Sequence, residues 1–119
     1  MDQRTLLTIA FLAFAAFFFY KKWKMGGNKV KLKEMLKQGA KVIDVRSPGE
    51  FAGGHFSGAI NIPLDQLKSK VETLGEKSQP IIVCCASGMR SSSALGTLKA
   101  AGFTNVENGV NTMTLQTLQ

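Results

Sequence analysis

Residues 80–101 read PIIVCCASGMRSSSALGTLKAA, and this stretch decides how the rest of the chain is interpreted. Its first part, residues 80–84, is a short apolar run that predicts a buried strand. Its last part, residues 91–101, carries apolar side chains at helical spacing and is followed by Gly102, a common helix stop. The pattern therefore predicts a tight loop between a strand and the start of a helix, where backbone N–H groups and the helix dipole favour anions.

The loop holds two adjacent cysteines, and each is a candidate nucleophile. Counted from Cys84, the stretch reads C-x5-R-S, the spacing of the phosphate-binding loop of a small cysteine phosphatase or arsenate reductase. Counted from Cys85, it reads C-x4-R, a tighter loop that suits an extra sulfur atom on the cysteine. The loop amides, the helix dipole and Arg90 all favour the reactive thiolate. On these residues alone, both readings stay open.

Outside this loop, strand patterns alternate with helical patterns. Such alternation predicts an α/β domain with a parallel sheet covered on both faces and with its chemistry at the carboxyl ends of the strands. Ser47 and Pro48 fit the N-cap and first position of a short helix. The expected strands lie at residues 41–45, 59–63, 80–84 and 105–106, and the expected helices at residues 30–39, 47–51, 64–75, 91–101 and 110–118.

Two long segments resemble single-domain rhodaneses, a family of sulfurtransferases. Residues 42–64 read VIDVRSPGEFAGGHFSGAINIPL, and residues 81–106 read IIVCCASGMRSSSALGTLKAAGFTNV. They carry D-V-R, E-F, G-H-x-x-G-A-x-N-I-P and C-x-x-G-x-R-S in the family's order. The resemblance implies a rhodanese-like three-layer α/β domain, with a central parallel sheet flanked by helices.

The resemblance also implies the site and its reaction. Cys85 would be the nucleophile, Cys84 would end the strand, and Asp44 and Arg46 would support the loop. A Cys85 persulfide would carry sulfane sulfur from thiosulfate or a persulfide donor to a thiol, cyanide or acceptor protein, without a metal or cofactor. The residues implied to bind the substrate are Ala86, Ser87, Gly88, Met89, Arg90 and Ser91.

Two other functions are weighed against this one. A phosphatase or arsenate reductase would use Cys84, and a membrane-tethered relay protein would pass on the Cys85 persulfide without turnover of its own. His55 is expected to be structural, with its ring hydrogen-bonded to backbone, and Arg46 is expected to form a local ion pair with Glu50. Unlike rhodaneses, which commonly end in a glycine pair, a tryptophan and a further helix, the tail has a single Gly109 and no tryptophan.

The N-terminal segment predicts a single-pass membrane anchor. Residues 5–20 read TLLTIAFLAFAAFFFY, without charge, and span about 24 Å as a helix, close to the minimum for a bilayer. A cleaved signal peptide would have its positive charge before the apolar run and a small-residue cleavage site after it, whereas this run ends in FFFY followed by lysines, which is a poor cleavage site. The predicted organisation is an anchor with its basic flank at residues 4–24, a linker at residues 25–28 and the domain at residues 29–119.

Basic residues after the apolar run set the expected orientation and partners. Trp23 suits the headgroup level, and the three lysines at residues 21, 22 and 24 outweigh the positive charge before the run, where Asp2 partly offsets Arg4. By the positive-inside rule the domain is therefore expected on the cytoplasmic side of the membrane. The net charge of +7 also includes Lys29, Lys31, Lys33 and Lys37, which suit anionic lipid headgroups or a solvated helix face. No aromatic residues alternate with these lysines, so nucleic acid is not an expected partner. Nor is a metal site, because there is one histidine and no C-x-x-C pair.

Overall fold

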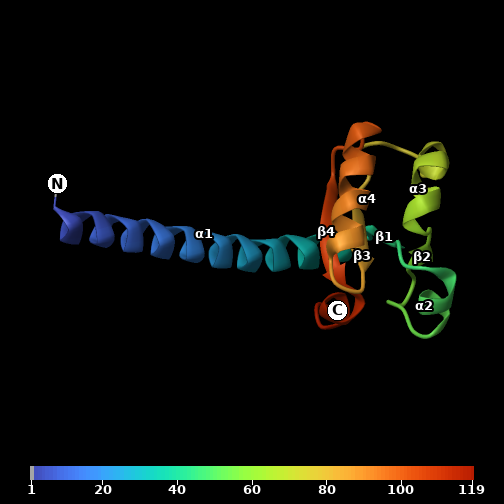
Figure 1. Cartoon of the computed structure of the whole chain (residues 1–119). Coiled ribbons are helices and arrows are strands. Elements are labelled where there is room, and N and C mark those ends of the chain that lie inside the picture. The colour runs from blue at the N-terminus through green and yellow to red at the C-terminus, as the bar shows by residue number, and fades with distance from the viewer. Residues whose placement is uncertain (1) are drawn as a thin grey trace. The chain divides into compact units, whose positions relative to one another are not determined.

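The computed structural model describes the backbone of residues 2–119 and, apart from residues 21–27, their side chains. The chain forms two compact units, the first ending at Lys31 and the second beginning at Leu32. The elements, labelled in Figure 1, are α1 (Gln3–Lys37), β1 (Lys41–Asp44), α2 (Pro48–Ala52), β2 (Ile60–Asn61), α3 (Leu64–Lys70), the 3-10 helix η1 (Val71–Thr73), β3 (Ile81–Cys85), α4 (Met89–Ala100), β4 (Val106–Asn111) and α5 (Thr112–Gln116).

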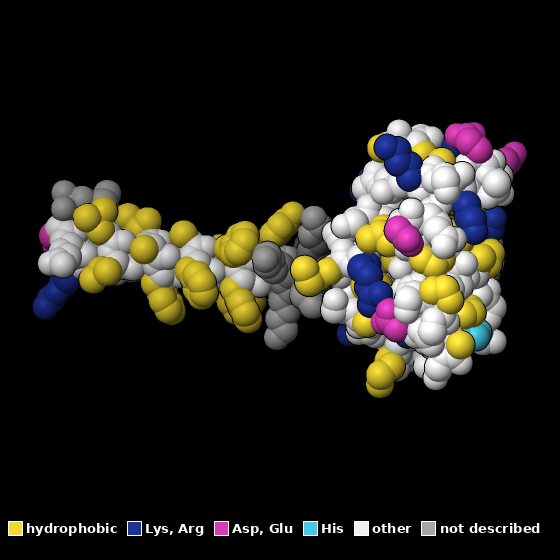
Figure 2. Space-filling view, turned by 45° about the vertical axis from the view of Figure 1, so that its right-hand side comes forward, with side chains coloured by type: hydrophobic (Ala, Val, Ile, Leu, Met, Phe, Trp, Pro, Cys, Tyr) yellow, Lys and Arg dark blue, Asp and Glu magenta, His cyan; other side chains and the backbone are white. Residues whose placement is uncertain are grey.

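The first unit contains the apolar part of α1. Residues Gln3–Tyr20 form 18 residues of helix with a mean hydropathy of 1.5, and none of this window is buried. Figure 2 shows apolar side chains along the length of this helix. This helix is long and apolar enough to cross a membrane, although a signal sequence has the same properties.

The second part of α1 differs in local structure from the sequence prediction. The backbone of residues 25–28, predicted as a linker, is helical. Helix-forming residues on both sides propagate the helix through Gly26 and Gly27, despite the cost of about 1 kcal/mol for each glycine. The side chains of Trp23 and the three lysines around it lie outside the described residues. The boundaries of anchor, linker and domain therefore stay predictions.

The second unit is built on a four-stranded parallel sheet in the order β2-β1-β3-β4. The strands predicted at residues 41–45, 59–63 and 80–84 are confirmed, with small differences at their ends. β4 is longer than predicted, because it continues to Asn111 instead of ending at Val106. It does so through an irregularity at Gly109, since Val83 pairs with Asn108 while the next residue of β3, Cys84, pairs with Val110.

Helices cover both faces of the sheet and form two core layers. The first core layer joins the sheet to α3 and α4 through residues such as Leu67 and Leu98. The second joins it to the end of α1 and to α5 through Leu32, Met35 and Leu115. Figure 1 shows α3 and α4 together on one side of the strands. The predicted three-layer α/β architecture is confirmed.

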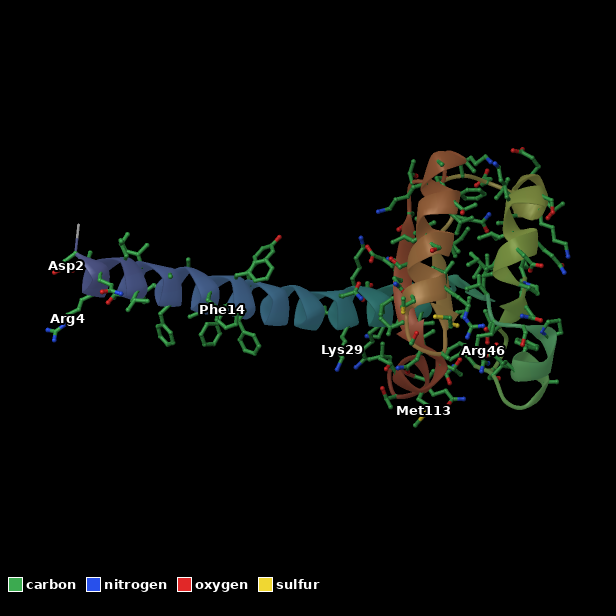
Figure 3. The ribbon with its side chains drawn as sticks, in the orientation of Figure 1. Asp2, Arg4, Phe14, Lys29, Arg46 and Met113 are labelled. Carbon is green, nitrogen blue, oxygen red and sulfur yellow. The ribbon has the colours of Figure 1, made fainter. Side chains whose placement is uncertain are left out.

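The C-terminal tail closes the second core layer as a short helix. Leu115 is buried, whereas Met113 is 77% exposed and projects from the lower end of the domain in Figure 3. A side chain at Gly109 would collide with Leu115 and Ile82, because its first carbon would lie 2.9 Å and 2.8 Å from them. Because position 109 is a glycine, α5 can pack tightly on the sheet, and this short helix completes the second core layer.

Candidate functional site

The candidate site is the loop between β3 and α4, at the carboxyl end of the central strands. Gly88 is the N-cap of α4, with a φ of 96° in the left-handed region, where glycine is favoured. The helix therefore begins at Met89, two residues before the predicted start at Ser91. Ser91 lies buried in the first turn of the helix.

Cys85 lies in the concave side of this loop. Its sulfur accepts a hydrogen bond from the Gly88 N–H at 2.9 Å and a longer one from the Ser91 N–H at 3.4 Å. The Ser91 hydroxyl also contacts the sulfur, with Oγ at 3.4 Å. Burial raises the pKa of the Cys85 thiol, but hydrogen bonds from the Ser91 hydroxyl and from the N–H groups of Ser91, Gly88 and Ser87 outweigh it, so the pKa lies below its ordinary value.

Cys84 lies on the opposite face of β3. It belongs to the second core layer, whereas Cys85 belongs to the first, as expected for adjacent residues of a strand. Burial and the nearby Asp44 carboxylate raise the pKa of the Cys84 thiol to about 12. The Thr112 hydroxyl and Arg46 offset this effect only in part. Cys84 therefore stays protonated at neutral pH.

Arg90, at the end of the loop, is held by an ion pair. Its two terminal nitrogens donate to both carboxylate oxygens of Glu50, at 2.7 Å and 2.9 Å. Glu50 also accepts from the N–H of Ser47, so that the two residues form a capping box at the start of α2. The Arg90 guanidinium, followed by the Ser47 N–H, lowers the pKa of Glu50 to about 2. The loop is thus tied to α2 through a charged pair.

The expected Arg46–Glu50 ion pair is wrong. Arg46 instead donates to both carboxylate oxygens of Asp44, with the shortest distance 2.7 Å, and also to the carbonyl of Gly54. Asp44 is fully buried, and its hydrogen bond is the main reason why the pKa of Arg46 is raised. The physical reason is local. The Arg46 side chain turns back to Asp44, two residues earlier at the end of β1, while Glu50, held in the capping box, pairs with Arg90 of α4.

Asp44 and Arg46 hold the backbone beneath the site. The hydrogen bonds described for the Asp44 carboxylate come from Arg46 and not from the N–H groups of the loop. Asn61, which sequence reasoning missed, donates to the carbonyls of both residues at 3.0 Å. Whether the pair affects catalysis stays a prediction.

Asn108 is a second residue that sequence reasoning missed. Its side-chain oxygen accepts from the Ser91 hydroxyl at 2.7 Å, and its side-chain nitrogen donates to the Gly88 carbonyl at 3.3 Å. Next to it, Val110 has a φ of 66°, unusual for a β-branched residue, and its N–H donates to the same Asn108 oxygen. The only nearby signal in the sequence was Gly109, which was interpreted as a difference from the usual rhodanese tail and not as part of a site.

The remaining predicted site residues lie on the outside of the loop. Ala86, Ser87 and Met89 are exposed, and Met89 has 79% of its surface accessible. His55 stacks on Phe51, and its Nδ1 lies 2.9 Å from the Phe51 carbonyl, which agrees with the expected structural role. Within the residues whose side chains are described, no group of His, Cys, Asp or Glu is arranged to hold a metal ion.

Comparison with known proteins adds independent information. A model of the rhodanese-like domain family matches residues 28–111. YqhL of Bacillus subtilis is 44% identical over 69 residues, which is 58% of this chain and 54% of that protein. The thiosulfate sulfurtransferase PspE of Escherichia coli is 40% identical over 67 residues, 56% of this chain and 64% of that enzyme. The chain thus matches less than two thirds of the length of either relative.

A solved structure supports the same relationship. A rhodanese from E. coli, described with bound anions, superimposes with a TM-score of 0.60 at 36% identity. The superposition covers 63% of this chain and 89% of the E. coli structure. Together with the parallel sheet and the cysteine loop, the family match shows that this chain belongs to the rhodanese-like domain family, whose relatives named here include a thiosulfate sulfurtransferase.

Proposed function

We propose that the protein is a sulfurtransferase that moves sulfane sulfur from thiosulfate or a persulfide donor to a thiophilic acceptor through a persulfide on Cys85. One observation carries this proposal. The Cys85 sulfur lies inside a ring of backbone N–H groups, with Gly88 N only 2.9 Å away, and its pKa is lowered. Such an environment favours the thiolate and, after sulfur loading, the persulfide anion.

The proposed reaction is a double displacement. The Cys85 thiolate attacks the outer sulfur of thiosulfate, the sulfur–sulfur bond of the donor breaks, and sulfite leaves with the bonding electron pair. A thiol or cyanide then attacks the terminal sulfur of the persulfide and releases the Cys85 thiolate. The covalent intermediate divides the transfer into two easier steps. Both anionic forms of the sulfur accept hydrogen bonds from the loop.

Arg90 gives the mouth of the loop a positive charge, although Glu50 neutralises much of it. Both contacts between the two side chains are direct, at 2.7 Å and 2.9 Å, and both residues are partly exposed. A dianionic donor therefore competes with Glu50 for the guanidinium. We expect Ala86, Ser87 and Met89 to contact the donor from the loop surface, with Ser91 and Gly88 on the sulfur side.

The phosphatase or arsenate reductase alternative has less support. It needs Cys84 as a thiolate, but this thiol lies in the second core layer with its pKa raised to about 12. A persulfide relay, which hands sulfur to an acceptor protein, uses the same Cys85 chemistry. It differs only in its slow turnover with small acceptors.

Thiocyanate formation from thiosulfate and cyanide tests the proposal. We expect turnover by the full chain, complete loss in Cys85→Ser and retention in Cys84→Ser. Turnover that depends on Cys84 instead would contradict the proposal. Loading of Cys85 with negligible turnover on cyanide and small thiols would favour the relay.

The apolar helix is proposed as a single-pass anchor, with the rhodanese-like domain on the cytoplasmic side of the membrane. The support is the length and hydropathy of Gln3–Tyr20, together with the three lysines at residues 21, 22 and 24. The lipid bilayer would then be a permanent partner, and sulfur acceptors would be reached from the cytoplasm.

A further inference from the structure

The Asn108 side chain connects β4 to the cysteine loop and the start of α4 through two hydrogen bonds, and accepts a third from within β4. Its Oδ1 accepts from the Ser91 hydroxyl at 2.7 Å and from the Val110 N–H at 2.8 Å, while its Nδ2 donates to the Gly88 carbonyl at 3.3 Å. Ser91 in turn contacts the Cys85 sulfur. One amide side chain therefore contacts both the loop backbone and the hydroxyl nearest the nucleophile.

The orientation of this amide follows from its backbone partners. The N–H of Val110 can only donate, and the carbonyl of Gly88 can only accept. The oxygen of the amide must therefore face Val110 and the nitrogen must face Gly88. The atom next to the Ser91 hydroxyl is consequently an acceptor without a proton.

The Ser91 hydroxyl has a single proton for two neighbours. Because Asn108 Oδ1 can only accept, the 2.7 Å contact requires Ser91 to donate to it. The contact between Ser91 Oγ and the Cys85 sulfur, at 3.4 Å, is then a hydrogen bond only if the thiol donates. This chain, from S–H to O–H to the amide oxygen, belongs to the neutral thiol.

A negatively charged sulfur requires the opposite orientation. Rotation about the Cβ–Oγ bond of Ser91 turns the hydroxyl proton toward the thiolate or persulfide anion. Asn108 Oδ1 then still accepts from the Val110 N–H, so no polar group is left without a partner. The thiol proton leaves to solvent, and the Ser91 and Asn108 oxygens, 2.7 Å apart, no longer have a proton between them, which is the cost that Asn108 imposes on the charged sulfur.

We propose that Asn108 is a positioning residue that holds the Ser91 proton away from the Cys85 sulfur in the thiol state and yields it when the sulfur is negatively charged. The proposal rests on the proposed function only in taking Cys85 as the nucleophile. It adds to that function that the Ser91 hydroxyl donates a hydrogen bond to the sulfur only when the sulfur is negatively charged. Asn108 acts through Ser91 and needs no contact with the substrate.

The charged groups around Cys85 are the same with and without Asn108. α4 contributes Arg90, which is paired with Glu50 of α2. β1 contributes Asp44, which is paired with Arg46, and β3 contributes the neutral Cys84 thiol. β4 faces the loop with the uncharged Asn108 amide. Replacing Asn108 by an apolar residue thus changes hydrogen bonding without removing a charge.

The test is the pH dependence of Cys85 alkylation by iodoacetamide, followed by peptide mass mapping of the full chain. Asn108→Ala leaves the Ser91 hydroxyl free to donate to the thiolate, so the midpoint is expected to fall by about 0.5 to 1 pH unit, the size of one hydrogen bond. Ser91→Ala removes this donor and is expected to raise the midpoint by a similar amount.

The double variant separates the proposed route from a general change of loop shape. In the Ser91→Ala background, Asn108→Ala is expected to shift the midpoint no further, because the hydroxyl that links Asn108 to the sulfur is gone. An equal shift in both backgrounds, no shift in either, or a rise with Asn108→Ala alone would overturn the proposal.

Folding is checked on the same samples by thermal unfolding, because Asn108→Ala also deprives Gly88 and Val110 of hydrogen bonds. If this variant does not unfold cooperatively, Asn108→Leu, which keeps the side-chain size, replaces it with the same expected result. Ser91→Ala alone must still raise the midpoint, and failure to do so overturns the proposal. Alkylation needs no sulfur donor, so failure of the sulfurtransferase proposal would be detected separately.

Discussion

At the scale of residues, two neighbouring cysteines have opposite chemical properties because a strand directs them to opposite faces. Cys84 packs with Leu32 and Leu115 and has a pKa of about 12, whereas the pKa of Cys85 lies below that of an ordinary thiol. Neither sulfur is part of a disulfide. The difference arises from burial in one case and from hydrogen-bond donors in the other.

We therefore expect Cys84→Ala to affect stability and not sulfur chemistry. Loss of the buried sulfur leaves a small cavity and is expected to lower the free energy of unfolding by about 1–2 kcal/mol. Chemical denaturation measures this loss, and Cys85→Ala is the matched variant for the activity. Sulfur loading should survive in Cys84→Ala and vanish in Cys85→Ala, and the reverse pattern would show that Cys84 is the nucleophile.

The raised pKa of Cys84 also predicts a dependence of stability on pH. An unfolded thiol ionises near its ordinary pKa of 9, but the folded thiol keeps its proton up to about 12. The stabilisation is therefore fully present below pH 9 and is lost as the pH rises toward 12. Unfolding curves at pH 8 and pH 10.5 should differ more for the wild type than for Cys84→Ala. Equal sensitivity of the two proteins would rule out this role of the thiol.

At the scale of elements, the loop depends on contact between two segments far apart in the sequence. Gly88 has a left-handed backbone, and a side chain there would approach Val110 of β4 to 3.0 Å. Val110 is itself left-handed, and the Asn108 side chain accepts from its N–H. The end of β4 thus forms a wall against which the cysteine loop is shaped.

Gly88→Ala should therefore damage the loop. The left-handed backbone alone is expected to cost about 1–2 kcal/mol of stability with alanine, and the contact with Val110 adds to it. We expect sulfur loading to slow about tenfold or more, because the N–H groups around the sulfur are displaced. Stopped samples analysed by mass spectrometry measure the loading rate, and thermal unfolding measures stability.

Gly96→Ala in the same helix is the matched control. A side chain at Gly96 meets nothing within 4 Å, and alanine favours a helix over glycine by up to about 1 kcal/mol. This variant should load sulfur normally and be at least as stable as the wild type. If Gly88→Ala behaved like Gly96→Ala, the tight loop would not be needed for the chemistry.

The local pattern of the chain predicted its elements, and the contacts between distant elements were not predictable. The strand–loop–helix of residues 80–101 followed from apolar spacing and glycines. By contrast, Glu50 and Arg90 are 40 residues apart, and their pairing depends on how α2 and α4 pack. Asn108 reaches Ser91 only because β4 bulges at Gly109, and no periodicity in the tail indicates such a bulge. The position of the cysteine loop was thus predictable from the sequence, but the side-chain contacts that support it were not, and the assignment of Cys85 as the nucleophile stays a prediction.

At the scale of the whole molecule, an apolar helix precedes a domain with the features of a sulfurtransferase. Tethering would restrict the enzyme to donors and acceptors that reach a membrane surface. The helix exposes large apolar residues such as Phe14 and Phe18. This composition suits either a membrane span or a signal sequence.

Membrane extraction tests the anchor. The full chain, expressed in a bacterium, is expected to stay in the membrane fraction after an alkaline wash and to keep the mass of residues 1–119. Phe14→Arg places a charge in the middle of the span, at a cost of about 2.5–3.5 kcal/mol, and should reduce insertion. Release by the wash, or a mature mass that lacks the apolar segment, would contradict the anchor and favour a signal sequence.

The most direct test of the central claim is the mass of the full chain and its peptides after incubation with thiosulfate. The persulfide mechanism predicts a gain of one sulfur atom on Cys85, absent from Cys85→Ser, present in Cys84→Ser and reversed by cyanide. No added sulfur, or sulfur located on Cys84, would contradict the mechanism and the assignment of Cys85 as the nucleophile.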